Sequence, residues 1–143
     1  MRAPPDPDHP LTASCACGAV TVTLKARPRS MFHCACLDCQ QASGGGHLPL
    51  IMMREADVEI AGATTAHQVV AASGAITTRH FCPICGSRIF GGSARSPGNV
   101  LVPAGLFGAS ADWFAPRSVI FARSLLHWDA IDAAIPRYDT YRN

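Results

Sequence analysis

All seven cysteines of this chain fall into three short clusters. The clusters are Cys15-Ala16-Cys17-Gly18, Cys34-Ala35-Cys36-Leu37-Asp38-Cys39 and Cys82-Pro83-Ile84-Cys85-Gly86. Spacings of one or two residues aim neighbouring sulfurs at a common point, which suits a metal ion better than a disulfide. Seven sulfurs divide into four, which close a tetrahedral zinc site, and three, which leave one position open for chemistry.

A disulfide framework is the main alternative to metal binding. An odd number of cysteines and adjacent Cys-x-Cys pairs suit an oxidising compartment poorly. Residues Met1 to Pro10 are polar and rich in proline, and they lack the apolar segment of a secretory signal. We therefore expect bound zinc and a cytoplasmic protein.

Length and composition favour a single domain. The chain has 143 residues, of which 48% are apolar, and no apolar run approaches the ~20 residues of a membrane span. Its eleven arginines are spread singly, whereas a nucleic-acid-binding surface gathers basic residues in one stripe. We expect a disordered tail over residues 1–12 and one zinc domain over residues 13–140, with neither nucleic acid nor membrane as a partner.

Short alternating apolar segments predict a mainly β fold. In the clearest strand, Val20, Val22 and Leu24 alternate with polar residues. Further strands are expected over residues 31–34, 48–53, 58–61, 68–72, 77–82, 88–90, 99–102 and 118–121. Helical signals are few: Leu37 to Ser43, which ends at a glycine run, and Trp128 to Ile135, which Pro136 would stop.

Two of the clusters end in Cys-Gly and look like a matched pair of zinc knuckles. The residue after the second cysteine of a knuckle often takes a backbone conformation that only glycine accepts easily. Gly18 and Gly86 occupy these positions. The pairing predicts one structural site made of Cys15, Cys17, Cys82 and Cys85.

The middle cluster offers three sulfurs from a strand end and the turn that follows it. Its open position would take water, a substrate thiol or a protein group. His33 precedes the cluster, but in an extended segment its side chain points away from Cys34, so we expect a packed or solvent-facing histidine. Spacing alone leaves open the alternative that Cys34, Cys36 or Cys39 enters the four-sulfur site.

The order of the motifs resembles a known family. The chain carries Cys15-x-Cys17-Gly18, then His33-Cys34-x-Cys36-x-x-Cys39-x-x-Ala42-Ser43-Gly44, then Arg79-x-Phe81-Cys82-x-x-Cys85-Gly86-x-x-Ile89-Phe90. This series resembles the glutathione-dependent formaldehyde-activating enzyme family, which includes proteins related to centromere protein V. The resemblance runs from about Ser14 to Tyr138.

The resemblance implies a fold, two metals and an activity. The fold would be the Mss4-like zinc fold, with small curled antiparallel sheets and one or two short helices. Structural zinc would bind Cys15, Cys17, Cys82 and Cys85, and a catalytic zinc would bind Cys34, Cys36 and Cys39. Because three protein ligands should exchange faster than four, we expect the second zinc to be more weakly held and partly occupied. The activity would be carbon–sulfur lyase or synthase chemistry on the adduct of glutathione with formaldehyde.

Such chemistry needs one group that transfers a proton and another that binds the substrate carboxylates. Asp38 is our candidate for the general acid and base, the alternative being a solvated residue beside the metal ligands, and Ser43 is our candidate for a hydrogen bond from the glycine-bounded turn. Arg79 is the candidate clamp for a substrate carboxylate. For Arg88 we favour surface solvation or charge balance for the four-thiolate site over a substrate contact.

The aromatic residues and the overall function leave alternatives. Trp113, Phe114 and Trp128 would line a pocket or belong to the core. Two functions compete with the enzyme: a non-catalytic, zinc-stabilised binding module, and a thiol or metal sensor that uses the three-cysteine site.

Overall fold

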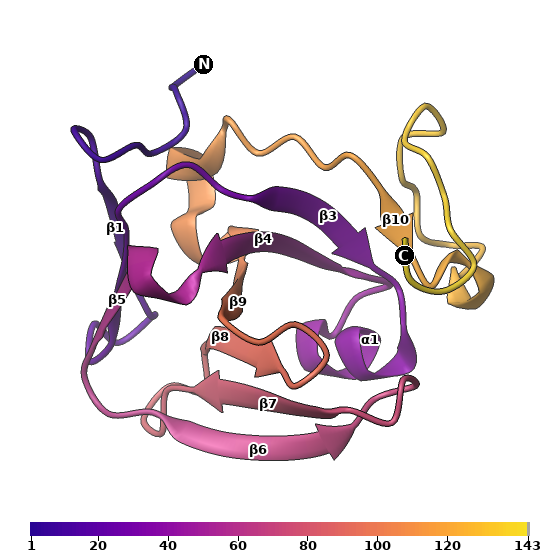
Figure 1. The fold of residues 1–143 in the computed structure, drawn as a ribbon, viewed down its shortest axis with the longest axis horizontal. Helices are drawn as coiled ribbons and strands as arrows, with labels where there is room; N and C mark the ends of the chain where they lie inside the picture. Colours follow the sequence, from indigo (N-terminus) through magenta and orange to yellow (C-terminus); the bar gives the residue numbers. More distant parts are fainter. Residues whose placement is uncertain (143) are drawn as a thin grey trace.

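The structure, a computed structural model, describes residues 1–142 and contains two β-sheets (Figure 1). The small sheet consists of β1 (Leu11–Ser14), β2 (Thr21–Leu24) and β5 (Val58–Ala61), in the order β1-β2-β5. The large sheet contains β3 (Ser30–Cys34), β4 (Leu48–Arg54), β6 (Thr65–Val70), β7 (Ile76–Phe81), β8 (Arg88–Ser93), β9 (Asn99–Pro103) and β10 (Val119–Ile120). Its strand order is β10-β3-β4-β9-β8-β7-β6, and among these strand pairs of the described residues only β10 with β3 is parallel. The mainly β architecture is the one that we predicted.

Helical structure is limited to short pieces. Helix α1 spans Leu37–Ser43 as predicted, and 3-10 turns occupy Glu55–Asp57 (η1), Ala104–Ala111 (η2) and Ala122–Ser124 (η3). Within residues 1–142, no helix is long and apolar enough to cross a membrane. With its cysteine clusters, this arrangement is compatible with the Mss4-like zinc fold.

The second expected helix, Trp128 to Ile135, is wrong. That segment consists of turns and irregular chain. The Asp132 carboxylate accepts the backbone N–H of Ala134 at 2.9 Å, a local bond that competes with the helical pattern. The chain then runs beside β10, where the backbone N–H of Val119 donates to Pro136 and the N–H of Tyr138 donates to Val119.

Strand β1 was missed because Leu-Thr-Ala-Ser carries too little apolar character to read as a strand. It pairs with β2 in the register Leu11 opposite Leu24. The folded domain therefore begins before the expected boundary at residue 13. Further upstream, the backbone N–H of Arg2 donates to the Asp112 carboxylate at 3.0 Å. The disorder expected for the rest of the tail stays a prediction.

Strand β4 divides the core because it is buried on both faces, as its nearly continuous apolar sequence suggests. Ile51 and Met53 face a first cluster, which β2 completes with Val22 and Leu24. Leu48 and Leu50 face a second cluster on the opposite side. The second cluster includes Cys34 and leads directly to the middle group of sulfurs.

Candidate metal centres and their pocket

The first and third cysteine clusters meet in space. Cys15, Cys17, Cys82 and Cys85 place their sulfurs within 4.8 Å of one another. Each cluster is closed by a backbone bond from its glycine: Gly18 donates its N–H to the carbonyl of Cys15 at 3.0 Å, and Gly86 donates to the carbonyl of Cys82 at 2.9 Å. The φ angles of these glycines are 82° and 77°, as the knuckle hypothesis required.

The spacing of these sulfurs fits a tetrahedral metal. Sulfurs bound to one zinc ion at about 2.3 Å lie about 3.8 Å apart, whereas a disulfide joins them at about 2.05 Å. The Sγ atoms of Cys15 and Cys17 are 3.6 Å apart, and those of Cys17 and Cys82 are 3.7 Å apart. Hydrogen bonding from Ser87 lowers the pKa of Cys85 to about 5, which favours the thiolate that a metal requires.

The middle cluster forms a separate group of three sulfurs. Cys34 ends β3, Cys36 is the N-cap of α1, and Cys39 lies in the first turns of that helix. Their sulfurs also lie within 4.8 Å of one another, and the backbone N–H of Cys39 donates to the Cys36 sulfur at 3.4 Å. The two clusters can therefore each hold a metal ion, and the sulfurs divide into four and three.

The three thiols of the middle cluster do not ionise independently. The hydrogen bond with Cys34 lowers the pKa of Cys36, and the same contact raises the pKa of Cys34. One negative charge is thus favoured among the three sulfurs, and further ionisation needs a cation close by. A divalent metal meets this need.

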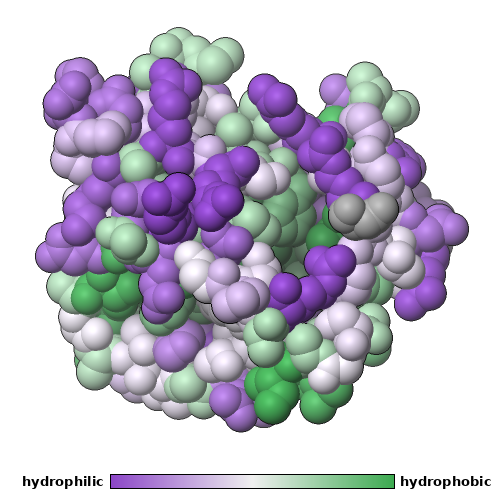
Figure 2. Space-filling view, viewed as in Figure 1, coloured by the Kyte–Doolittle hydropathy of each residue, from purple (hydrophilic) through white to green (hydrophobic). Residues whose placement is uncertain are grey.

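A pocket of about 430 Å³ opens beside the middle cluster. Figure 2 shows an apolar hollow framed by hydrophilic side chains on this face. Apolar residues from β3, β4, β9 and β10 line one side: Phe32, Leu50, Met52, Leu101 and Ile120. Four arginines line the pocket as well: Arg79, Arg88, Arg95 and Arg123. The only carboxylate in the described lining is Asp38.

Arg88 is the most deeply placed of these cations. Its Nε and Nη1 atoms are buried and have no hydrogen-bond partner within residues 1–142. Burial lowers its pKa, and charge on Cys39 acts in the opposite direction. A Cβ at Gly91 would lie 2.9 Å from the backbone oxygen of Thr78 and 3.3 Å from Nη2 of Arg88, so the close approach of β7 requires glycine there. Our preference for the four-thiolate site was wrong, because Arg88 faces the three-cysteine cluster.

Asp38 and Arg79 form an ion pair at the pocket edge. The distance from Arg79 Nη2 to Asp38 Oδ1 is 3.5 Å. The Asp38 side chain is 42% exposed and that of Arg79 is 17% exposed. The carboxylate can therefore exchange protons with water while it stays next to the sulfurs.

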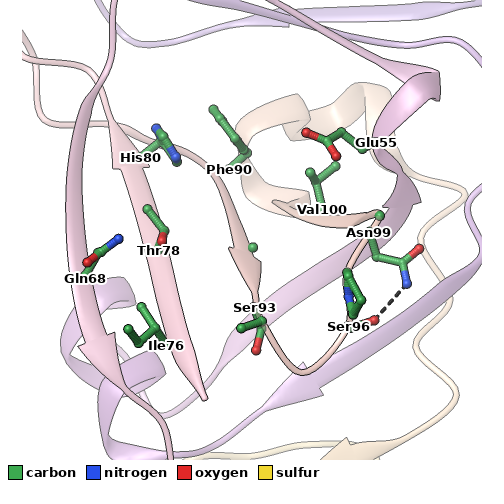
Figure 3. A pocket seen from close by; sticks show the side chains of 14 residues that line it. Glu55, Gln68, Ile76, Thr78, His80, Phe90, Ser93, Ser96, Asn99 and Val100 are labelled. Carbon is green, nitrogen blue, oxygen red and sulfur yellow. Dashed lines mark hydrogen bonds between the residues drawn. The ribbon is translucent and has the colours of Figure 1, made fainter.

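A second pocket of about 480 Å³ lies on the other face of the β7–β8 hairpin (Figure 3). Because side chains alternate along β7, Thr78 and His80 line this pocket, whereas Thr77 and Arg79 line the first. His80 stacks on Phe90 with the ring centroids 4.1 Å apart. No cysteine contributes to its described lining, whereas the three-cysteine cluster lines the first pocket.

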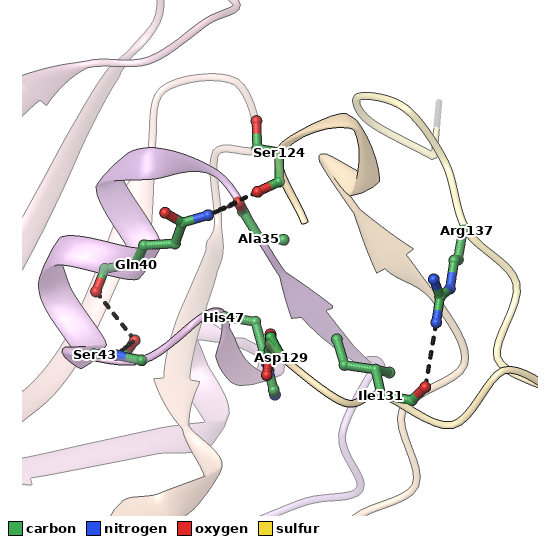
Figure 4. Close-up of polar contacts among 9 residues, drawn as sticks. Ala35, Gln40, Ser43, His47, Ser124, Asp129, Ile131 and Arg137 are labelled. Carbon is green, nitrogen blue, oxygen red and sulfur yellow. Dashed lines mark hydrogen bonds and ion pairs between the residues drawn. The ribbon is translucent and has the colours of Figure 1, made fainter. Parts of the chain in front are cut away.

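Ser43 lies at the far end of α1 and is not among the described residues that line either pocket. Its hydroxyl donates to the Gln40 carbonyl at 3.3 Å and accepts the Gly45 N–H at 3.0 Å, so it serves the local turn (Figure 4). Gln40 itself anchors the helix, because its side-chain amide donates to the carbonyls of Ala35 and Ser124, each at 2.9 Å. The structure does not bring Ser43 to the cluster.

His33 turns away from the sulfurs, as the strand alternation predicted. Its ring lies 4.4 Å from that of His47, whose Nδ1 is 2.7 Å from the Asp129 carboxylate. Of the aromatic candidates, Trp113 is in the first core cluster, with Phe114 packed against that cluster. Trp128 is 60% exposed and lines neither pocket within the described residues.

Sequence reasoning missed the residues that close the pocket from distant segments. The guanidinium of Arg95 lies 3.6 Å from the centre of the Tyr141 ring, and Tyr141 packs edge-on against Phe121 at 4.8 Å. Phe121 has a φ of 56°, a conformation that is costly for a bulky residue and clusters at functional sites. No local motif marks Arg95 or Tyr141.

Fold and site together define a mainly β protein with two cysteine clusters that can hold metals. Residues 10–124 match the family model "glutathione-dependent formaldehyde-activating enzyme", so the chain belongs to this family. No curated protein matches the sequence. A solved structure of a Rhodobacter sphaeroides protein, a structural genomics target, is similar with 18% identity and a TM-score of 0.57. The similarity covers 74% of this chain and 97% of that chain, and it shows the fold. The relation to centromere protein V stays a prediction.

Proposed function

We propose that this protein is a zinc-dependent carbon–sulfur lyase and synthase that acts on adducts of glutathione with an aldehyde. The observation that carries the proposal is the three-cysteine cluster, which opens onto a pocket with four arginines. The family description supplies glutathione and formaldehyde as the chemical class. A cytoplasmic location, where thiols stay reduced, suits this chemistry.

The two sulfur clusters would have different roles. Cys15, Cys17, Cys82 and Cys85 form a closed set of ligands and serve the fold. Cys34, Cys36 and Cys39 leave one ligand position free. Zinc bound there would supply an open coordination site that favours the ionised form of a substrate thiol near neutral pH.

The pocket arginines bind and orient the substrate. Glutathione carries two carboxylates, and a guanidinium binds a carboxylate through two parallel hydrogen bonds. Arg79 lines the same pocket as the three cysteines and is held there by its contact with Asp38. Buried Arg88 has two donor atoms without a hydrogen-bond partner in the described chain, so an oxygen of the substrate would accept hydrogen bonds that the folded chain does not.

Asp38 acts as the general acid and base. In synthesis, the substrate sulfur forms a bond with the aldehyde carbon, the π-bond of the carbonyl breaks, and the oxygen takes a proton from the Asp38 carboxyl. The proton that the thiol lost returns to Asp38 through solvent, so thiol and aldehyde together equal the hemithioacetal product. Lysis reverses each step. The partial exposure of Asp38 suits this exchange with water.

The test measures exchange between glutathione, formaldehyde and their adduct by NMR on zinc-loaded protein. Thiols add to formaldehyde spontaneously, so the rate without protein is subtracted. The proposal expects a rate above this background that depends on Asp38, with Asp38→Asn reducing it and Ser43→Ala leaving it unchanged. Binding of glutathione without any excess rate would instead support the binding module.

A further inference from the structure

The pocket beside the three cysteines has two chemically different sides. Because side chains alternate along a strand, Phe32 and Cys34 of β3 lie on the same face as Leu50 and Met52 of β4. Leu101 of β9 and Ile120 of β10 extend this face, and both pack against the same cluster. We call Phe32, Leu50, Met52, Leu101 and Ile120 the apolar floor. The arginines supply the cationic side.

The fold itself buries Phe32 and Leu50, so a formaldehyde adduct would leave the half-buried part of the apolar floor, Met52, Leu101 and Ile120, without a partner. Formaldehyde contributes a single carbon that carries a hydroxyl group. Glutathione is polar along its length, with two carboxylates, an ammonium and two amides. Burying those groups against Met52 or Leu101 would remove them from water without replacing their hydrogen bonds. The arginines can bind the glutathione carboxylates, but they make no apolar contact that would cover the floor.

The three cysteine sulfurs lie close to both the apolar floor and the cationic side of the pocket. Cys34 is buried in the same cluster as Phe32 and Leu50, whereas Asp38 links the neighbouring sulfurs to Arg79. The three cysteines therefore line the pocket together with both sides, and a substrate sulfur bound beside them would have the floor on one side and the arginines on the other. With the glutathione part bound by arginines, the substituent on the aldehyde carbon is directed toward the floor.

We propose that the adduct used by this protein derives from a larger apolar aldehyde, aliphatic or aromatic, rather than from formaldehyde. The proposal rests on the proposed function and specifies its substrate class. The volume of about 430 Å³ lies within the usual range for small-molecule pockets and provides room for such a group.

The experiment measures binding, so that it does not depend on turnover. S-methyl-, S-butyl- and S-hexylglutathione are stable thioethers that share one polar part and differ in alkyl length. Isothermal titration of zinc-loaded protein gives their Kd values. Since burial of one CH₂ group is worth ~0.8 kcal/mol, the Kd should fall up to about fourfold per methylene. We expect at least a thirtyfold difference between S-methyl and S-hexyl, as an order-of-magnitude value.

Met52→Gln places a polar group on the floor at a half-buried position. It should weaken binding of S-hexylglutathione about tenfold or more and leave S-methylglutathione nearly unchanged. Met31→Gln is the matched control, because Met31 lies on the adjacent strand β3 and packs against the other core cluster. It should preserve the dependence on alkyl length. Thermal melts of both variants check that they remain folded.

The possible outcomes distinguish a failure of the apolar-substrate proposal from a failure of the proposed glutathione-dependent function. Equal Kd values for all three thioethers would overturn the apolar substrate and leave glutathione as the thiol. Absence of binding by every thioether and by glutathione would overturn both proposals. Length dependence that survives Met52→Gln but is lost in Met31→Gln would contradict the location of the floor.

Discussion

The two sulfur clusters differ in how far apart their members lie along the chain. The four-cysteine cluster joins residues 65 positions apart and, in the described residues, lines neither pocket. The three-cysteine cluster comes from six consecutive residues and borders the arginine-lined pocket. A ligand set that spans the sequence closes a loop and holds the fold, whereas a local set can be altered without opening that loop.

The largest effect should come from breaking the long-range cluster. Cys82 is fully buried, and Cys82→Ser removes one of four sulfurs. Structural zinc contributes about 10–16 kcal/mol in small modules, which is comparable with or larger than the 5–15 kcal/mol stability of a typical domain. We expect an unfolded or insoluble product, checked by circular dichroism and zinc content. A soluble variant that melts cooperatively and holds full metal would contradict the structural role.

The middle cluster should respond in the opposite way. Cys36→Ala should reduce exchange of the glutathione adduct to the spontaneous rate while the melt stays cooperative, because the other cluster remains whole. Purified protein should carry between one and two zinc per chain, and this variant should approach one. Excess rate that persists in Cys36→Ala would move the chemistry away from the three cysteines.

Replacing Arg88 tests whether this residue lowers the stability of the fold and increases the affinity for the substrate. A buried guanidinium without partners costs free energy, so Arg88→Met should raise the melting temperature by several degrees, for about 1–2 kcal/mol. The same change should raise the KM for the glutathione adduct about 10–100-fold, the value of one charge-assisted hydrogen bond. Arg88→Lys should restore part of the affinity. A lower melting temperature with an unchanged KM would assign Arg88 to the fold.

The sulfur clusters could be predicted from local sequence motifs. The rest of the pocket could not, because its residues come from distant parts of the chain. The glycines after Cys17 and Cys85 marked the paired turns, because the backbone there needs a positive φ. Arg88 was assigned to the wrong cluster because it follows Cys85 closely, yet β8 carries it to the other site. Tyr141 joins the pocket through tertiary packing, which no local pattern reports.

The terminal segment shows tertiary structure overriding local preference. Apolar and helix-forming residues between Trp128 and Ile135 predicted a helix, but backbone bonds to β10 on the far side of Pro136 fix the path of the chain. The same path brings Tyr141 to Arg95 at the pocket.

The smallest effect should come from a group that supports the four-cysteine cluster without belonging to it. The Ser87 hydroxyl lies 3.2 Å from the Cys85 sulfur and accepts the backbone N–H of Ala16 at 3.2 Å. Cys85 is exposed, so water can replace part of the bond that Ser87→Ala removes. We therefore expect about a tenfold loss of metal affinity, the low end for groups that orient a ligand, with the fold intact. Competition with a chelator should show faster release of the slowly exchanging zinc only. Ser43→Ala, which removes a hydroxyl at the end of α1, is the control and should change neither zinc. If Ser87→Ala instead accelerated release of the weakly held zinc, the two clusters would be coupled, and the division of the sulfurs into an independent structural four and catalytic three would fail.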